Sequence, residues 1–282
     1  MEITIRTALA SASALLLNST SARLDAEVLL AHSWGQSRSY LFAHPESPIP
    51  ALILQRFTAG VQQRQQGVPI AYITGQCEFW SLSLAVTPAT LIPRPETELL
   101  VEKALVYVRS GCRILDLGTG SGAIALALAT ECPDCQIVAV DQSPAALAVA
   151  ACNIQALALT HVHLLCSDWF AALPPSFFAG FDLIVANPPY ISPNDPHLQQ
   201  GDVRFEPKTA LTAAEDGLQA IRLIIQQAPR FLRPKGYLLL EHGYNQAQAV
   251  QHLLQEQGYG AIQHHLDLSG WIRVTQGQLK DY

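Results

Sequence analysis

Four consecutive residues, Asn187-Pro188-Pro189-Tyr190, combine oxygen acceptors, a stiff backbone and a flat aromatic ring. The Asn187 side-chain oxygen and the Pro188 carbonyl can each accept one hydrogen of a planar NH2 group. The two prolines lack backbone donors and restrict the turn. Tyr190 can stack on an amide or a nucleobase. The tetrapeptide predicts a substrate-binding site for a planar NH2 nitrogen, in which Asn187 and Pro188 are the catalytic residues.

The chemistry that suits such a site is alkylation of a weak nucleophile. An amide nitrogen reacts poorly because its lone pair is delocalised into the carbonyl, so an enzyme must hold it in line with an activated methyl group. Catalysis would then consist mostly of positioning, and no general base is required. The alternative interpretation is a proline-rich turn in which Asn187 only caps the strand.

A glycine-rich loop, Gly118 to Gly122, follows an apolar run and opens a helix rich in alanine and leucine. Glycines let a backbone pass close to a bound ligand. Asp141 lies 19 positions beyond Gly122, where a carboxylate can meet a ribose hydroxyl pair. The same pattern fits a nicotinamide dinucleotide, so the loop alone leaves that cofactor and a turn without a ligand open.

Two further features favour S-adenosyl-L-methionine. Asp116 precedes the glycines, and the segment resembles the acidic-x-Gly-x-Gly-x-Gly loop of class I methyltransferases, which faces an amino acid moiety. Asp168 and Trp169 follow a third apolar run and can bracket adenine by hydrogen bonding and stacking, although Trp169 could instead pack in the core. The predicted cofactor-binding residues are Gly118, Thr119, Gly120, Ser121, Gly122, Asp141, Asp168, Trp169 and Asn187.

The elements that position these residues follow from changes in hydrophobic periodicity. Residues 1–75 show helical stripes, and the stretch that follows alternates as short β-strands do. Beyond Gly111, apolar runs of strand length alternate with helical stretches, which predicts a doubly wound, mostly parallel α/β sheet. A helix is expected to begin near Pro95. The predicted strands are 114–117, 137–140, 162–165, 181–186 and 237–240, with 264–268 and 272–276 as possible edge strands.

Composition narrows the class of protein. The 282 residues are 49% hydrophobic and 14% charged, which indicates a well-buried globular core. The net charge of −6 supplies no basic field for nucleic acid, so we expect no direct nucleic acid binding.

Six scattered cysteines, including Cys132 and Cys135 in a C-x-x-C, are expected to be reduced thiols. No metal site is predicted, because the histidines lack ligand spacing. The N-terminus fits neither a signal peptide nor a membrane span, which favours the cytoplasm.

Several longer stretches carry a resemblance that extends over almost the whole chain. These are residues 67–75 (GVPIAYITG), 78–80 (EFW) and 91–98 (LIPRPETE), followed by 204–207 (RFEP), 216–218 (DGL), 241–243 (EHG) and 273–275 (RVT). Together with the tetrapeptide they resemble the peptide chain release factor glutamine methyltransferases, the HemK or PrmC family. Asn-Pro-Pro-Tyr alone is shared with methyltransferases that act on DNA adenine, RNA guanine and ribosomal protein glutamine.

The resemblance implies a seven-stranded class I methyltransferase sheet that uses S-adenosyl-L-methionine. It implies a helical release-factor-binding domain at 1–75, a β-hairpin linker at 76–93 and a methyltransferase domain at 94–282. The expected reaction is methylation of the glutamine side-chain amide in the Gly-Gly-Gln motif of class 1 peptide chain release factors, with Asn187 to Tyr190 holding the glutamine. Arg94 is a candidate contact near the cofactor, and we expect a cytoplasmic monomer that does not bind membranes.

Three alternatives stay open from the sequence. An RNA or DNA base amino-group methyltransferase could use the same tetrapeptide, although no basic stretch interleaved with aromatic residues is visible. A binding module could keep the cofactor fold without turnover, although Asn187 and Pro188 are intact. A nicotinamide dehydrogenase would fit the loop but lacks a hydride-site signature.

Overall fold

The chain divides into two units in the computed structural model, which describes residues 2–214 and 216–281. One unit comprises Met1–Gln76 together with Gln199–Phe205, and the other comprises Cys77–Leu198 together with Glu206–Tyr282. We call them the helical unit and the catalytic unit.

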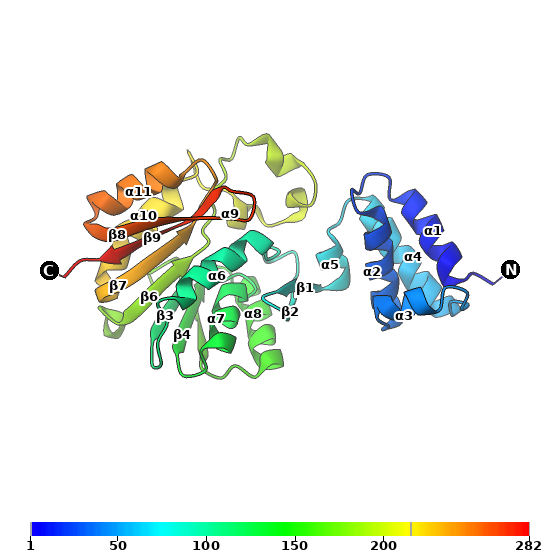
Figure 1. Cartoon of the computed structure of the whole chain (residues 1–282), viewed down its shortest axis with the longest axis horizontal. Helices are drawn as coiled ribbons and strands as arrows, with labels where there is room; N and C mark the ends of the chain where they lie inside the picture. The colour runs from blue at the N-terminus through cyan, green and yellow to red at the C-terminus, as the bar shows by residue number, and fades with distance from the viewer. Residues whose placement is uncertain (1, 215, 282) are drawn as a thin grey trace. The chain divides into compact units, whose positions relative to one another are not determined.

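The helical unit is built from short amphipathic helices around one apolar core. Its helices are α1 (Ile5–Leu15), α2 (Ala22–Trp34), α3 (Arg38–Ala43), α4 (Ala51–Gln65) and α5 (Ile70–Thr74) (Figure 1). Thr4 and Thr7 form a capping box that satisfies backbone donors at the start of α1. Leu9, Leu30 and Phe57 lie in the core, where each exposes no more than 3% of its surface. This burial stabilises helices that would be marginal in isolation.

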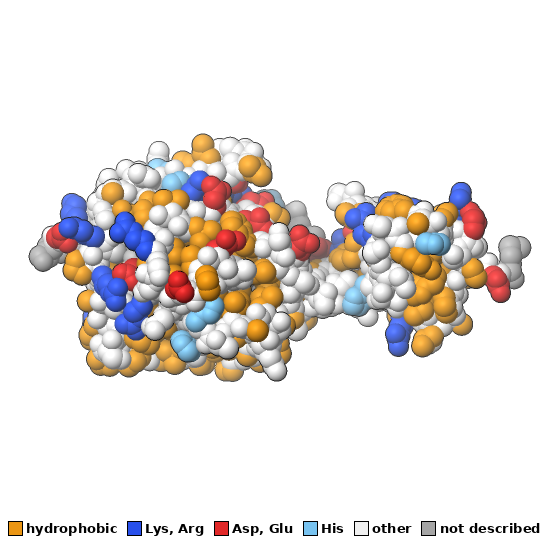
Figure 2. All heavy atoms as spheres, turned by 60° about the horizontal axis from the view of Figure 1, so that its bottom comes forward, with side chains coloured by type: hydrophobic (Ala, Val, Ile, Leu, Met, Phe, Trp, Pro, Cys, Tyr) orange, Lys and Arg blue, Asp and Glu red, His pale blue; other side chains and the backbone are white. Residues whose placement is uncertain are grey.

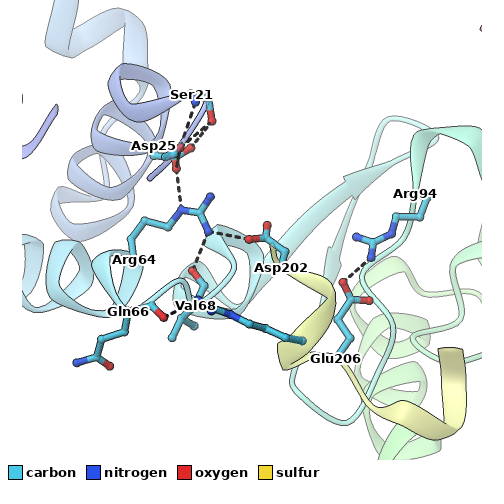
Figure 3. Close-up of polar contacts among 10 residues, drawn as sticks. Ser21, Asp25, Arg64, Gln66, Val68, Arg94, Asp202 and Glu206 are labelled. Atoms are coloured by element: carbon cyan, nitrogen blue, oxygen red, sulfur yellow. Dashed lines mark hydrogen bonds and ion pairs between the residues drawn. The ribbon is translucent and has the colours of Figure 1, made fainter. Parts of the chain in front are cut away.

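A segment distant in sequence completes the helical unit through Arg64. This guanidinium, on α4, donates to Asp25 Oδ2 at 2.7 Å and to Asp202 Oδ1 at 2.8 Å (Figure 3). It also donates to the Val68 carbonyl at 3.2 Å. Only 7% of the Asp25 side chain and 13% of the Arg64 side chain are exposed. Arg64 therefore neutralises a buried carboxylate and binds the segment 199–205 at the same time.

We predict that Arg64→Met destabilises the protein by about 2–3 kcal/mol, because it leaves Asp25 buried without its cation. The loss of stability should be smaller than for a buried charge left without any partner, since the hydroxyls of Ser19 and Ser21 still donate to Asp25. Urea unfolding of the full chain, followed by circular dichroism, measures the change. The matched control is Arg6→Met, which breaks an exposed pair with Glu46 and should cost under about 0.5 kcal/mol. Equal losses for the two variants would contradict the role of Arg64.

The catalytic unit contains a seven-stranded sheet. Its strands are β3 (Arg113–Leu117), β4 (Gln136–Asp141), β5 (Val162–Cys166), β6 (Phe181–Ala186), β7 (Leu232–Glu241), β8 (Tyr259–Leu266) and β9 (Ile272–Leu279). The order is β5-β4-β3-β6-β7-β9-β8, in which the first five are parallel and β9 runs antiparallel to both neighbours. The expected mostly parallel, seven-stranded fold is confirmed. The two late segments form β8 and β9, which pair with each other. Only β8 is an edge strand, whereas β9 lies between β7 and β8, so the expectation of an edge strand at 272–276 is wrong.

Helices cover both faces of this sheet (Figure 1). Leu183 and Val185 of β6 pack in the core on the side of α6 and α7, and Ile184 packs with α10 and α11 on the other side. Alternate residues thus point to opposite cores, and both sets are apolar because neither face meets water.

The helices of the catalytic unit are α6 (Glu98–Leu105), α7 (Ala123–Glu131), α8 (Pro144–Leu157), α9 (Lys208–Leu211), α10 (Gln219–Gln227) and α11 (Ala247–Glu256). Single 3-10 turns are η1 (Pro95–Thr97), η2 (Pro175–Phe177), η3 (Pro196–Gln199), η4 (Val203–Phe205) and η5 (Ala228–Arg230).

A short hairpin of β1 (Gln76–Phe79) and β2 (Leu82–Ala85) precedes the catalytic sheet. Phe79 and Leu84 are buried in the core beside α6 and α7. Asn153 of α8 hydrogen-bonds both the N–H and the carbonyl of Ala85, at 2.7 and 3.0 Å. The expected helix near Pro95 begins as a 3-10 turn, and the α-helix starts at Glu98. None of the described helices is long and apolar enough to cross a membrane.

Candidate active site

A cavity of about 290 Å³ opens at the carboxyl ends of the parallel strands. Ligands bind at this edge of open α/β sheets, where the connections from neighbouring strands diverge. The cavity is lined by Ala89, Thr90, Leu91, Gly118, Gly120, Asp141, Gln142, Ser143, Ala145, Ala146, Ser167, Asp168, Trp169, Asn187, Pro189, Pro207, Thr209 and Ala210.

The glycine loop connects β3 to α7 along one wall. Gly118, Gly120 and Gly122 all have positive φ, between 57° and 89°, a region that glycine adopts without strain. The Gly118 and Thr119 N–H groups both donate to the Val140 carbonyl at 2.9 Å, which pins the loop to β4. A Cβ atom at Gly122 would lie only 3.0 Å from the Leu126 side chain. The glycines therefore allow a tight loop as well as a close approach to a ligand.

Asp141, at the end of β4, holds the same loop from the side of the cavity. Its Oδ2 accepts from Gly120 N at 2.9 Å, and its Oδ1 accepts from Ser143 N at 2.8 Å. A carboxylate has about four lone-pair positions, so these two bonds leave acceptor capacity for ligand hydroxyls. Ser143 in turn caps α8 through a bond from Ala146 N. Asp141 therefore shapes the cavity wall as well as lining it.

Asp116 lies behind the glycine loop and is fully buried. Thr119 Oγ1 donates to its Oδ2 at 2.6 Å. Burial raises the pKa of Asp116 to about 7, because water no longer solvates the charged form. Asp116 is the residue that separates the two candidate cofactors, since Asp141 can meet the ribose of either one. An acidic group beneath the loop disfavours the pyrophosphate of a dinucleotide and fits S-adenosyl-L-methionine, which carries positive charge on its sulfonium and amino groups.

Trp169 and Asp168 form the wall that follows β5. Trp169 is half-buried and has a positive φ of 48°, which is uncommon for a residue with a side chain. Ser167 stabilises this turn, since its hydroxyl donates to the Trp169 carbonyl at 2.8 Å and accepts from Ala172 N at 3.0 Å. Asp168 is exposed at the cavity rim. The geometry allows the bracketing of an adenine ring that the sequence predicts.

The tetrapeptide begins immediately after β6, and Asn187 and Pro189 line the cavity. Asn187 Nδ2 donates to Thr97 Oγ1 at 3.1 Å. Among the described residues no donor reaches Asn187 Oδ1, so this acceptor stays available to a ligand. The Tyr190 hydroxyl donates to Glu241 Oε1 at 3.3 Å, and burial raises the pKa of the tyrosine.

The backbone of this turn is packed tightly from the far side. Gln246 Nε2 donates to the Tyr190 carbonyl at 3.1 Å. Gly217 has a φ of +79°, and a Cβ atom there would lie 2.3 Å from that same carbonyl. Only glycine fits so close to the turn, which explains the physical need for Gly217 in the DGL segment.

The cavity brings six of the nine predicted cofactor-binding residues together. The six are Gly118, Gly120, Asp141, Asp168, Trp169 and Asn187. The cavity is not lined by the other three predicted cofactor-binding residues, Thr119, Ser121 and Gly122. It is also not lined by Pro188 and Tyr190, which were predicted to bind the substrate. Ser121, for example, is buried and presents its carbonyl to Asn153 at 2.8 Å. Arg94 does not line it either, because its guanidinium forms an ion pair with the buried carboxylate of Glu206 (Figure 3).

Sequence reasoning assigned no cofactor role to three stretches of the lining, which are Ala89 to Leu91, Gln142 to Ala146 without Pro144, and Pro207 to Ala210 without Lys208. Leu91 and Pro207 are the end residues of two stretches that resemble the family. None of the three stretches contains a residue type that is specific for cofactor binding, and only their placement in space reveals the contact. Thr97 and Glu241 also lie within stretches that resemble the family, but their residue types alone predict no role in the site.

Comparisons with known proteins agree with this geometry. A PrmC N-terminal domain matches residues 7–75, and a methyltransferase domain matches residues 108–280. The release factor glutamine methyltransferase of Escherichia coli (strain K12) is 51% identical over 261 residues, covering 92% of this chain and 93% of that protein. The same-named protein of Salmonella typhimurium is 51% identical over 264 residues, covering 93% and 94%. A solved methyltransferase from Pyrococcus furiosus, at 17% identity and a TM-score of 0.54, covers 71% of this chain and 90% of that one, which shows a shared fold alone.

We predict that Asp141→Asn weakens binding of S-adenosyl-L-methionine about 10- to 100-fold, because the new NH2 group faces a backbone N–H that the carboxylate accepted. Isothermal titration measures the dissociation constant. Asp182→Asn is the matched control, since Asp182 accepts from Arg113 N and pairs with Arg233 at the start of β6, at the opposite edge of the sheet. An unchanged affinity in Asp141→Asn, or the same loss in the control, would contradict the role of Asp141.

Proposed function

The chain belongs to the family of release factor glutamine methyltransferases, and we propose that it methylates the glutamine side-chain amide in the Gly-Gly-Gln motif of class 1 peptide chain release factors. The observation that carries this proposal is the placement of Asn187, which lines the same cavity as the glycine loop and Asp141. A methyl acceptor held at Asn187 would therefore lie next to the cofactor.

The proposed mechanism is positioning by oxygen acceptors. S-adenosyl-L-methionine, when bound, supplies an activated methyl group on a sulfonium. Asn187 Oδ1 and the Pro188 carbonyl would each accept one hydrogen of the glutamine NH2 group, which directs the nitrogen toward the cofactor. Pro188 and Pro189 keep the turn rigid, so little ordering is needed on binding. Tyr190 would pack against the flat amide.

We further propose that residues 1–75 form the release-factor-binding domain, that 76–93 form the linker and that 94–282 form the methyltransferase domain. Apolar side chains on the surface of the helical unit support a docking role (Figure 2). Leu17 is 85% exposed, and Leu15, Phe42 and Leu52 each expose at least 55%. Exposed apolar side chains of this kind are common at protein–protein contacts.

The substrate is a protein rather than a nucleic acid in this proposal. The net charge of −6 offers little for counterion release on a phosphate backbone, which supplies much of the affinity for nucleic acids. The relatives that match over more than 90% of the chain carry the name release factor glutamine methyltransferase. We propose that the enzyme acts in the cytoplasm, as a monomer.

The direct test is co-incubation of the full chain with a purified release factor and S-adenosyl-L-methionine, followed by peptide mass spectrometry. We expect one added methyl group, on the glutamine of the Gly-Gly-Gln peptide. A release factor in which this glutamine is replaced by alanine is the matched control and should gain none. Methylation of RNA or DNA, with none on the release factor, would refute the proposal.

We predict that Asn187→Ala keeps the affinity for S-adenosyl-L-methionine within about threefold but lowers kcat about 100-fold or more, because the target amide loses an acceptor that aligns it. Titration calorimetry and single-turnover methylation of the release factor separate the two effects. A variant that binds the cofactor poorly yet turns over normally at saturation would reverse the assigned role.

A further inference from the structure

The orientation of one side-chain amide decides whether this site can hold an NH2 group. An asparagine presents an acceptor on one side and two donors on the other, and a half-turn about the last bond exchanges them. With Oδ1 toward the cavity, Asn187 can accept from a glutamine amide. With Nδ2 toward the cavity, it would oppose the amide hydrogens. Something in the protein must therefore select one orientation.

Thr97 makes the contact that can select it. This residue ends η1 and is only 4% exposed, and its hydroxyl accepts from Asn187 Nδ2 at 3.1 Å. The Thr97 hydroxyl also lies within reach of the Glu241 carboxylate, and this contact lowers the pKa of Glu241. A hydroxyl has one hydrogen, so once it donates to Glu241 it can only accept from Asn187. Asn187 must then offer Nδ2 to Thr97, which leaves Oδ1 facing the ligand.

Glu241 fixes the other end of the tetrapeptide as well. It is the last residue of β7 and is 2% exposed, and its Oε1 accepts from the Tyr190 hydroxyl at 3.3 Å. An ionised carboxylate is an acceptor only, so it dictates the direction of both hydrogen bonds. One buried carboxylate thus orders Tyr190 directly and Asn187 through Thr97.

We propose that Thr97 and Glu241 are positioning residues for methyl transfer, which set the amide of Asn187 and the ring of Tyr190 in the orientation that accepts the substrate NH2 group. This inference rests on the proposed function and adds to it the groups that make the tetrapeptide competent. Neither residue lines the cavity, so each acts through another side chain.

The rate of methyl transfer should depend on pH, because the orientation of the Asn187 amide depends on whether Glu241 is ionised. Burial raises the pKa of Glu241 to about 7, although hydrogen bonds from Thr97 and Tyr190 and the charge of Arg273 lower it, and the charge of Glu96 raises it. Below that pKa the protonated carboxyl can donate to Thr97, whose hydroxyl is then free to donate to Asn187 Oδ1. That arrangement favours the wrong amide orientation. Turnover should therefore rise as the pH increases through about 7.

The test compares Thr97→Val with Thr97→Ser in the full chain, assayed by methylation of the release factor. The valine variant keeps the shape of threonine but has no hydroxyl, and we expect kcat to fall about 10- to 100-fold with the cofactor affinity unchanged. The serine variant keeps the hydroxyl and should stay within about threefold of the original kcat. Thr130→Val is the matched control, because that hydroxyl bonds only the Leu126 carbonyl of its own helix among the described residues.

The pH profile supplies a readout that a purely structural role would not move. We expect kcat of the unaltered chain to rise between about pH 6 and about pH 8, and kcat of Glu241→Gln to be flat there, since glutamine does not titrate. The two pH profiles also test the positioning role of Glu241 if the Thr97→Val variant fails to fold. A valine variant with full kcat, or a Glu241→Gln variant that keeps the rising limb, would overturn the proposal. Absence of methylation by the unaltered chain would instead refute the proposed function.

Discussion

Parallel pairing of β4, β3 and β6 is the constraint on which the site depends. Each of these strands ends at the same edge of the sheet, so Asp141, the glycine loop and Asn187 meet there although Gly118 and Asn187 are 69 positions apart in the chain. Such pairing requires both faces of the sheet to be covered by helices. The apolar residues of α7 and α10 therefore contribute to the site indirectly, because they bury the strands that carry it.

Saturation of hydrogen bonds then determines which atoms a ligand can reach. The carboxylate of Asp141 accepts two backbone N–H groups and keeps the remaining lone pairs. The amide of Asn187 gives its nitrogen to Thr97 and keeps its oxygen. In both residues, hydrogen bonds within the protein use some of the donor and acceptor positions of the side chain. The positions that are left for a ligand therefore point in a fixed direction. A site that works by positioning needs this kind of order before the substrate arrives.

Two fully buried carboxyl groups have an energetic cost in the folded state. Burial raises the pKa of Asp116 and of Glu241 to about 7, well above the values near 4 in an unfolded chain. Between these values the folded protein binds more protons than the unfolded one, so its stability falls as the pH rises through this window. The ionised forms are nevertheless the ones that fit a cationic cofactor and orient Asn187. Function and stability therefore favour opposite ends of the same pH range.

The sequence by itself determined the fold class, the cofactor loop, the tetrapeptide and the family, because these depend on periodicity and on contiguous motifs. Gly118 to Gly122 and Asn187 to Tyr190 are local patterns whose residue types already imply their chemistry. The antiparallel pairing of β8 with β9, the docking of Asp202 on Arg64 and the link from Asn187 through Thr97 to Glu241 were decided only by the tertiary structure. Those contacts join residues up to 144 positions apart in the chain, and ordinary threonine, aspartate and glutamate side chains acquire such roles only from the neighbours that folding gives them.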